Sequence, residues 1–75
     1  MDALIKLSTQ LGQALEEKNF TLALAESCTG GLASAAITDI AGSSAWFDCG
    51  FVTYSNAAKQ SMLNVSEKTL TQYGA

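Results

Sequence analysis

The residues that could carry chemistry are concentrated in the stretch Glu26–Gly31, Glu-Ser-Cys-Thr-Gly-Gly. Ser27 supplies a hydroxyl that could attack a carbonyl carbon, with the backbone N–H groups of Thr29, Gly30 and Gly31 as candidate donors to the oxyanion. The two glycines also allow a ligand to approach the backbone closely. The same turn could instead hold a nucleotide phosphate through its N–H groups and hydroxyls, and the residue types alone do not decide between these two functions.

A serine nucleophile needs a base, and the sequence contains no histidine. Lys59 and Tyr54 are candidates, because a partly desolvated lysine can lose its proton near neutral pH and a tyrosine can relay or orient that proton. Each residue also has a simpler interpretation: Ser27 as a helix cap, Lys59 as a solvated helix residue and Tyr54 as a surface aromatic. Glu26 is interpreted as a carboxylate that stabilises the turn or favours the helix dipole.

The elements around these residues predict an α/β arrangement. Leu22–Ala25 is apolar and short enough for a buried strand, and residues 31–40 have helical spacing. Residues 46–54 are aromatic and β-branched, with Gly50 marking a bulge or a close backbone approach. If the two strands are parallel, both polar clusters follow their carboxyl ends and share one edge of the sheet. An antiparallel pairing would separate them.

Helices are predicted before and after this strand–helix–strand unit in the sequence. The leucine spacing of the first residues predicts an amphipathic helix that begins near Asp2 and stops at Asn19. Residues 42–44 are predicted to form a loop. Ser55 is predicted to cap a short helix, and Ser66 to cap a last helical stretch that runs from Glu67 to about Tyr73.

Composition limits the classes of protein to which the chain can belong. At 75 residues and 48% hydrophobic content it is at most one small domain, and its apolar strands predict a covering layer from more chain or another subunit. The net charge of −3, with four lysines as the only basic residues, argues against a nucleic-acid surface. No apolar stretch approaches the roughly 18 residues of a membrane span, and a cytoplasmic location is expected.

The two cysteines, Cys28 and Cys49, have no metal-binding spacing, so neither a metal nor another cofactor is expected. Cys28 is interpreted as a small, half-buried turn residue, with a reactive thiol as the alternative. Cys49 is interpreted as a core residue.

Three segments in order carry a resemblance to a known family: residues 25–31 (AESCTGG), 37–44 (ITDIAGSS), and 50–56 (GFVTYSN) with Lys59 three residues later. Together they resemble the CinA C-terminal domain family, the nicotinamide-nucleotide amidases, from about Leu4 to the end. The resemblance implies hydrolysis of the carboxamide of nicotinamide mononucleotide to nicotinate mononucleotide and ammonia, in pyridine-nucleotide salvage. No metal is implied.

The resemblance also assigns residues. The family's serine nucleophile falls on Ser27, its tyrosine on Tyr54 and its lysine on Lys59. The turn that contains Thr29, Gly30 and Gly31 is assigned to oxyanion or phosphate contacts. The implied partner is a small nucleotide substrate, with neither nucleic acid nor membrane.

The expected fold class is α/β, a layered αβα sandwich of which this chain would be an incomplete half. Family members continue for roughly as many residues again, so residues 1–75 are expected to be the N-terminal half of a single amidase domain. The start at Met1 resembles the family's short, stand-alone form. The exposed sheet edge of such a half-domain predicts a homo-oligomer or strand exchange. The alternatives are a non-catalytic nucleotide-binding module and an inert fragment that only self-associates.

Overall fold

A computed structural model describes residues 2–74 of the chain. Its elements follow the predicted order, with one addition, a 3-10 turn (η1) where residues 42–44 were predicted to be a loop. In chain order the elements are α1 (Asp2–Lys18), β1 (Leu22–Glu26), α2 (Leu32–Thr38), η1 (Ser43–Ala45), β2 (Phe47–Val52), α3 (Asn56–Leu63) and α4 (Glu67–Tyr73).

The two strands pair in parallel, with α2 and η1 forming the connection between them. Leu24 is opposite Gly50, and Glu26 is opposite Val52. Because paired residues of parallel strands project from the same face, these four positions share one side of the sheet. The strands therefore end together, as the shared-edge arrangement requires.

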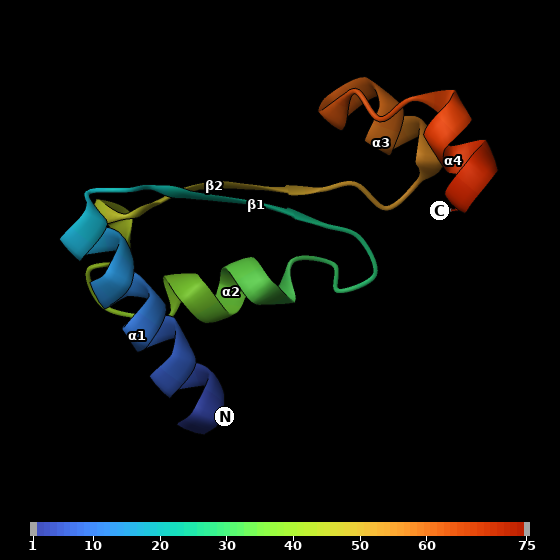
Figure 1. Cartoon of the computed structure of the whole chain (residues 1–75). Helices are drawn as coiled ribbons and strands as arrows, with labels where there is room; N and C mark the ends of the chain where they lie inside the picture. The colour runs from blue at the N-terminus through green and yellow to red at the C-terminus, as the bar shows by residue number, and fades with distance from the viewer. Residues whose placement is uncertain (1, 75) are drawn as a thin grey trace.

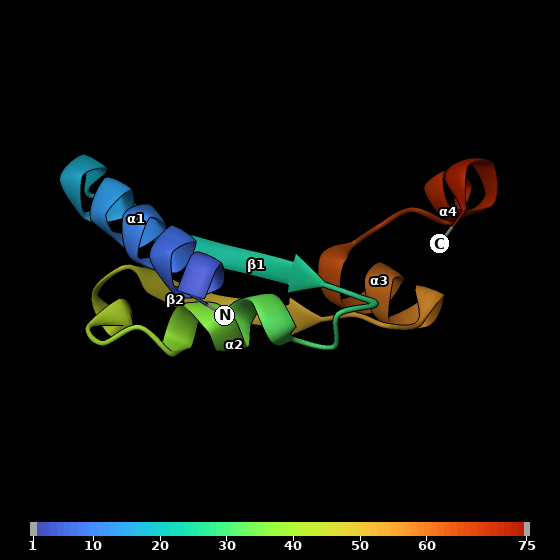
Figure 2. The same cartoon turned by 90° about the horizontal axis from the view of Figure 1, so that it is seen from below.

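The helices are unevenly distributed around the sheet. Helices α1 and α2 lie against the same face of the strands, whereas α3 and α4 lie beyond the carboxyl ends (Figures 1 and 2). This parallel, helix-covered sheet confirms the predicted α/β class. The opposite face carries Ala23, Ala25, Cys49 and Phe51, as the register requires, and Phe51 is 38% exposed.

Gly50 marks a close approach between the sheet and α2. A Cβ atom on Gly50 would lie 2.5 Å from Oγ of Ser34 in α2, a distance that real Cβ atoms do not reach. The predicted close approach at this glycine is therefore correct. The irregularity in the strand pairing lies elsewhere, between Leu22 and Ala23.

The core is small. Ile37 and Trp46 are the buried hydrophobic residues among those that the structure describes, and Trp46 packs against Gly12 of α1. Large hydrophobic side chains are exposed on every side of the described chain: Leu4, Ile5, Leu7, Leu11, Phe20, Leu32, Phe51, Val52, Tyr54, Met62 and Tyr73.

The helix ends follow the predicted local signals. Asn19 follows α1 in the left-handed conformation, with φ of 58°. The Ser55 hydroxyl accepts a hydrogen bond from the N–H of Ala58, and the Ser66 hydroxyl accepts one from the N–H of Thr69. These contacts fix where α3 and α4 begin.

Gly12→Ala tests the packing of α1 on Trp46. Helix propensity alone predicts a gain of about 1 kcal/mol. The new Cβ would however lie 2.5 Å from Cζ2 of Trp46, so we expect overpacking to dominate and the free energy of unfolding to fall by about 1 kcal/mol. Urea titration followed by far-UV circular dichroism measures it. The neighbouring exposed residue gives the control, Gln13→Ala, and a more stable Gly12→Ala variant would contradict the packing.

Candidate active site

The candidate site lies where β1 and β2 end. The N–H of Thr53 donates a 2.8 Å hydrogen bond to the carbonyl oxygen of Glu26, which continues the parallel pairing by one step. Ser27 and Tyr54 are the next residues along each chain segment. The structure thus brings the two predicted polar clusters to one edge of the sheet, beyond its carboxyl ends.

A tight turn connects β1 to α2. The N–H of Gly30 donates to the carbonyl of Ser27 over 3.1 Å, and the N–H of Leu32 donates to the carbonyl of Thr29 over 3.3 Å. Gly30 and Gly31 have φ values of 66° and 108°, in the left-handed region that side chains with a Cβ atom rarely adopt. The two glycines are therefore needed for the chain to turn this sharply into α2.

The Glu26 carboxylate is the best-connected group of the site. Its Oε1 accepts hydrogen bonds from Oγ1 of Thr29 (2.7 Å) and the N–H of Ala33 (2.8 Å). Its Oε2 accepts from the N–H and the hydroxyl of Ser34, at 3.0 and 2.7 Å. Gly31 at the N-cap position of α2 has no side chain to offer, so Glu26 satisfies the first-turn N–H groups of the helix instead.

These bonds determine the charge of Glu26. The hydroxyl of Ser34 and then that of Thr29 stabilise the ionised form, and they lower the pKa from an ordinary value of 4.5 to about 2. Desolvation acts in the opposite direction, since Glu26 is only 8% exposed, but the hydrogen bonds outweigh it. Glu26 is therefore a carboxylate at neutral pH, which matches the turn-stabilising interpretation of the sequence.

The turn offers fewer free donors than the sequence predicted. Gly30 was a candidate oxyanion donor, but its N–H already donates to the carbonyl of Ser27. Within residues 2–74, the N–H groups of Thr29 and Gly31 make no hydrogen bond to the protein. These two therefore remain as candidate oxyanion donors from the turn.

The three predicted catalytic residues lie at this edge in different surroundings. Ser27 and Lys59 are half-buried, whereas Tyr54 is 76% exposed. The Ser55 cap places Lys59 in the first turns of α3, where its N–H donates to the Ser55 carbonyl over 3.0 Å. Across residues 2–74, no side-chain hydrogen bond joins Ser27 to Tyr54 or Lys59. The structure thus brings Ser27 and Tyr54 to one edge and places Lys59 in the helix that follows, without a closed hydrogen-bonded triad.

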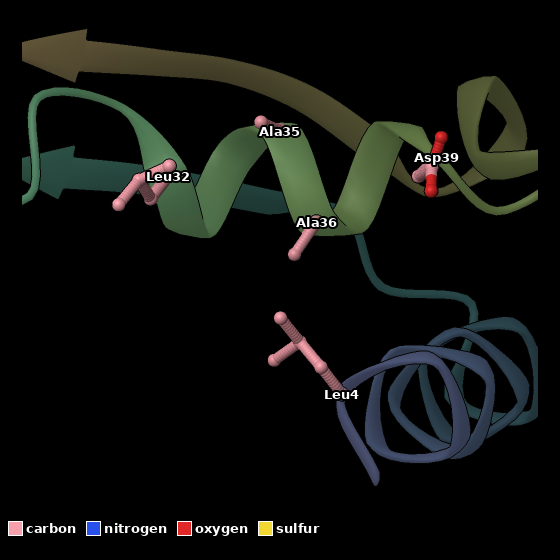
Figure 3. Close-up of a pocket in the computed structure, with 5 residues that line it drawn as sticks. All are labelled: Leu4, Leu32, Ala35, Ala36 and Asp39. Carbon is pink, nitrogen blue, oxygen red and sulfur yellow. The ribbon is translucent and has the colours of Figure 1, made fainter. Parts of the chain in front are cut away.

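An apolar groove of the described chain lies elsewhere. An open groove of about 490 Å³ runs between α1 and α2, lined by Leu4, Leu32, Ala35, Ala36 and Asp39 (Figure 3). It contains none of the candidate catalytic residues, and apolar side chains make up most of its lining. The groove therefore lies apart from Ser27 and Tyr54, which follow the strand ends.

The described part of the chain contains neither a metal-binding cluster nor a membrane-spanning helix. Residues 2–74 hold no group of three histidine, cysteine, aspartate or glutamate side chains suited to binding a metal ion. No helix in the same range is long and apolar enough to cross a membrane. Cys28 is exposed rather than half-buried, and Cys49 is half-buried rather than fully in the core.

Comparison with known proteins identifies the family of the chain. The sequence profile of the CinA C-terminal domain matches residues 4–75. The chain belongs to the CinA C-terminal domain family. Two similar relatives are both named nicotinamide-nucleotide amidohydrolase PncC. The protein from Enterobacter agglomerans is 67% identical over 70 residues, which are 93% of this chain and 43% of the relative. The one from Escherichia coli K12 is 61% identical over 72 residues, 96% of this chain and 44% of the relative.

Solved structures of CinA proteins superpose closely on this chain. The competence/damage-inducible protein CihA from Agrobacterium tumefaciens gives a TM-score of 0.91 at 47% identity, covering 96% of this chain and 44% of that one. A CinA superfamily protein from Escherichia coli gives 0.93 at 35% identity, covering 96% and 42%. The chain thus spans less than half the length of these CinA relatives.

Ser34 is a site residue of this CinA chain that sequence reasoning did not single out. It lies inside α2, where a serine carries no strong local signal, and its partner Glu26 precedes it by eight residues. The signal that does exist is Gly50, the glycine within β2 that leaves room for the Ser34 hydroxyl. Only the packing of α2 on the sheet brings Ser34 next to Gly50.

Glu26→Gln tests the ionisation of this carboxylate. The folded pKa of about 2 lies below the ordinary 4.5, so the unfolded chain binds the proton more readily. The resulting stabilisation is present above pH 4.5 and is lost as the pH falls towards about 2. We expect the thermal unfolding midpoint of the unmodified chain to fall more steeply across this window than that of Glu26→Gln.

Glu17, an exposed residue of α1, supplies the matched control. Glu17→Gln should keep the steep fall of the unmodified chain. An equally steep fall in Glu26→Gln would show that Glu26 is not the group that titrates.

Proposed function

We propose that this chain carries the nucleophilic half of a nicotinamide-nucleotide amidase, which hydrolyses the carboxamide of nicotinamide mononucleotide. The observation that carries the proposal is the parallel pairing of Glu26 with Val52, because it brings the Ser27 turn and the Tyr54–Lys59 segment to one edge. The names of the Enterobacter and Escherichia relatives support the same substrate. Activity of the whole protein is part of the proposal, since the chain spans less than half of those relatives.

In the proposed reaction, Oγ of Ser27 attacks the carboxamide carbon while Lys59, as the general base, takes the hydroxyl proton. The N–H groups of Thr29 and Gly31 stabilise the oxyanion of the tetrahedral intermediate. The C–N bond then breaks, and the nitrogen leaves as ammonia with the proton returned from Lys59. Water hydrolyses the resulting ester to nicotinate mononucleotide and restores the Ser27 hydroxyl. Tyr54 orients Lys59 or relays the proton.

The charge of the turn argues against the alternative of a passive phosphate cradle. The N–H groups of Ala33 and Ser34, which would bind a phosphate at the start of α2, already donate to Glu26. Because Glu26 is ionised, a phosphate placed there would meet a like charge and no free helix donors.

Ammonia release from nicotinamide mononucleotide tests the proposal. The assay compares the 75-residue chain with a chimera in which residues 4–75 replace the matching part of the Escherichia coli relative. We expect the chimera to release ammonia, and Ser27→Ala to lower kcat by about 10⁴ or more because the nucleophile is lost. Lys59→Met should lower kcat by about 10² to 10⁴, the usual contribution of a general base.

Matched controls exist for both variants. Ser44→Ala and Lys68→Ala alter exposed residues outside the site and should leave ammonia release unchanged. Full activity in the Ser27→Ala chimera would overturn the nucleophile assignment. Saturable binding of the mononucleotide without ammonia release would favour a binding module instead.

A further inference from the structure

We propose that Glu26 is the positioning residue for Ser27. Its carboxylate holds the 27–31 turn between β1 and α2 through hydrogen bonds to Thr29, Ala33 and Ser34, which together we call the clamp. The contact of Ser34 with Gly50 keeps the clamp aligned with the second strand. This inference rests on the proposed function, because it assigns the clamp a role in the chemistry of Ser27. It adds three residues, Glu26, Ser34 and Gly50, that carry no reacting atom.

The clamp closes the nucleophile turn at both ends. Glu26 is covalently attached to Ser27, and its side chain reaches seven and eight residues ahead to Ala33 and Ser34. A third bond, to the hydroxyl of Thr29, holds the middle of the turn. The turn contains two adjacent left-handed glycines, which have the largest conformational freedom to lose. Without the carboxylate, only backbone hydrogen bonds such as that from Gly30 to Ser27 would hold the turn that carries the Ser27 hydroxyl.

Glu26 is placed to orient rather than to accept the proton of Ser27. A carboxylate offers about four acceptor positions, two on each oxygen. Thr29 and Ala33 occupy the positions on Oε1, and the N–H and hydroxyl of Ser34 occupy those on Oε2. No position is left for the Ser27 proton. The base must therefore be another group at this edge, in agreement with the proposed role of Lys59.

Gly50 connects the clamp to β2. The Ser34 hydroxyl lies only 2.5 Å from the position that a Cβ atom of residue 50 would occupy, and it donates to Glu26 over 2.7 Å. Any side chain at position 50 would displace this hydroxyl and remove one of the two donors on Oε2. The strand that leads to Tyr54 thereby controls the turn that carries Ser27.

Steady-state kinetics of the chimera test this inference, with Glu26→Gln, Ser34→Ala and Gly50→Ala as variants. The glutamine amide would place its N–H groups against the donors of Thr29 and Ala33 or of Ser34, so part of the clamp opens. We expect kcat per folded enzyme to fall about 10- to 100-fold in Glu26→Gln, as for a small misplacement of a reacting group, with KM changed less than about threefold. Gly50→Ala and Ser34→Ala should show the same split with smaller losses in kcat.

The pH dependence of kcat separates positioning from proton transfer. A positioning role predicts that Glu26→Gln lowers the whole profile and leaves its apparent pKa values in place, whereas a base role predicts loss of the acidic limb. Loss of that limb would overturn the inference. Glu17→Gln is the matched control and should leave kcat and KM unchanged.

The outcomes also separate this inference from the proposed function. Suppose that the unmodified chimera releases ammonia and Ser27→Ala does not. Full kcat in Glu26→Gln and Ser34→Ala would then overturn the positioning role of Glu26 and leave the proposed amidase function intact. If Glu26→Gln does not fold, Ser34→Ala decides, since it leaves three of the bonds to Glu26. If the unmodified chimera releases no ammonia, the clamp falls together with the proposed function.

Discussion

The ionised carboxylate of Glu26 at the start of α2 is the interaction on which the rest of this structure depends. Removing a carboxylate from water is unfavourable unless donors replace its hydration, and here four donors do so. Its negative charge also lies at the positive end of the helix dipole. One residue thus accepts hydrogen bonds from the N–H groups at the start of α2, holds the turn and pairs with Val52 of the second strand. The sheet, the crossover helix and the candidate site share this group.

Local signals predicted most of the fold. Ser55, Ser66 and Asn19 act through neighbours within a few residues, so their roles can be recognised in the sequence and are confirmed by the helix ends. The α/β class and the close approach at Gly50 followed from pattern in the same way. The 3-10 turn at Ser43–Ala45 was missed, because a cluster of glycine and serine is equally typical of an irregular loop.

The meeting of Ser27 and Tyr54 at one edge was predictable from the sequence, but the hydrogen bonds around them were not. Placing Ser27 and Tyr54 at one edge required only that the strands be parallel. The occupied N–H of Gly30 and the contact between Ser34 and Gly50 depend on backbone direction and on how α2 packs against the sheet. Neither is encoded in spacing along the chain. The resemblance to the CinA family assigned the candidate reacting residues, and the sequence suggested Glu26 as a turn-stabilising carboxylate. Its partners Ala33 and Ser34 emerged only from the structure.

The parallel pairing has a consequence for the order in which the site forms during synthesis. The contacts of Glu26 with Thr29, Ala33 and Ser34 span at most eight residues, so they can form as soon as α2 has emerged from the ribosome. The pairing of β1 with β2 must wait for the crossover of residues 27–46 to close, which carries a larger entropy cost. Lys59 follows within a few residues of that closure. The 27–31 turn can thus be shaped early, and the proposed base arrives only once the second strand has docked.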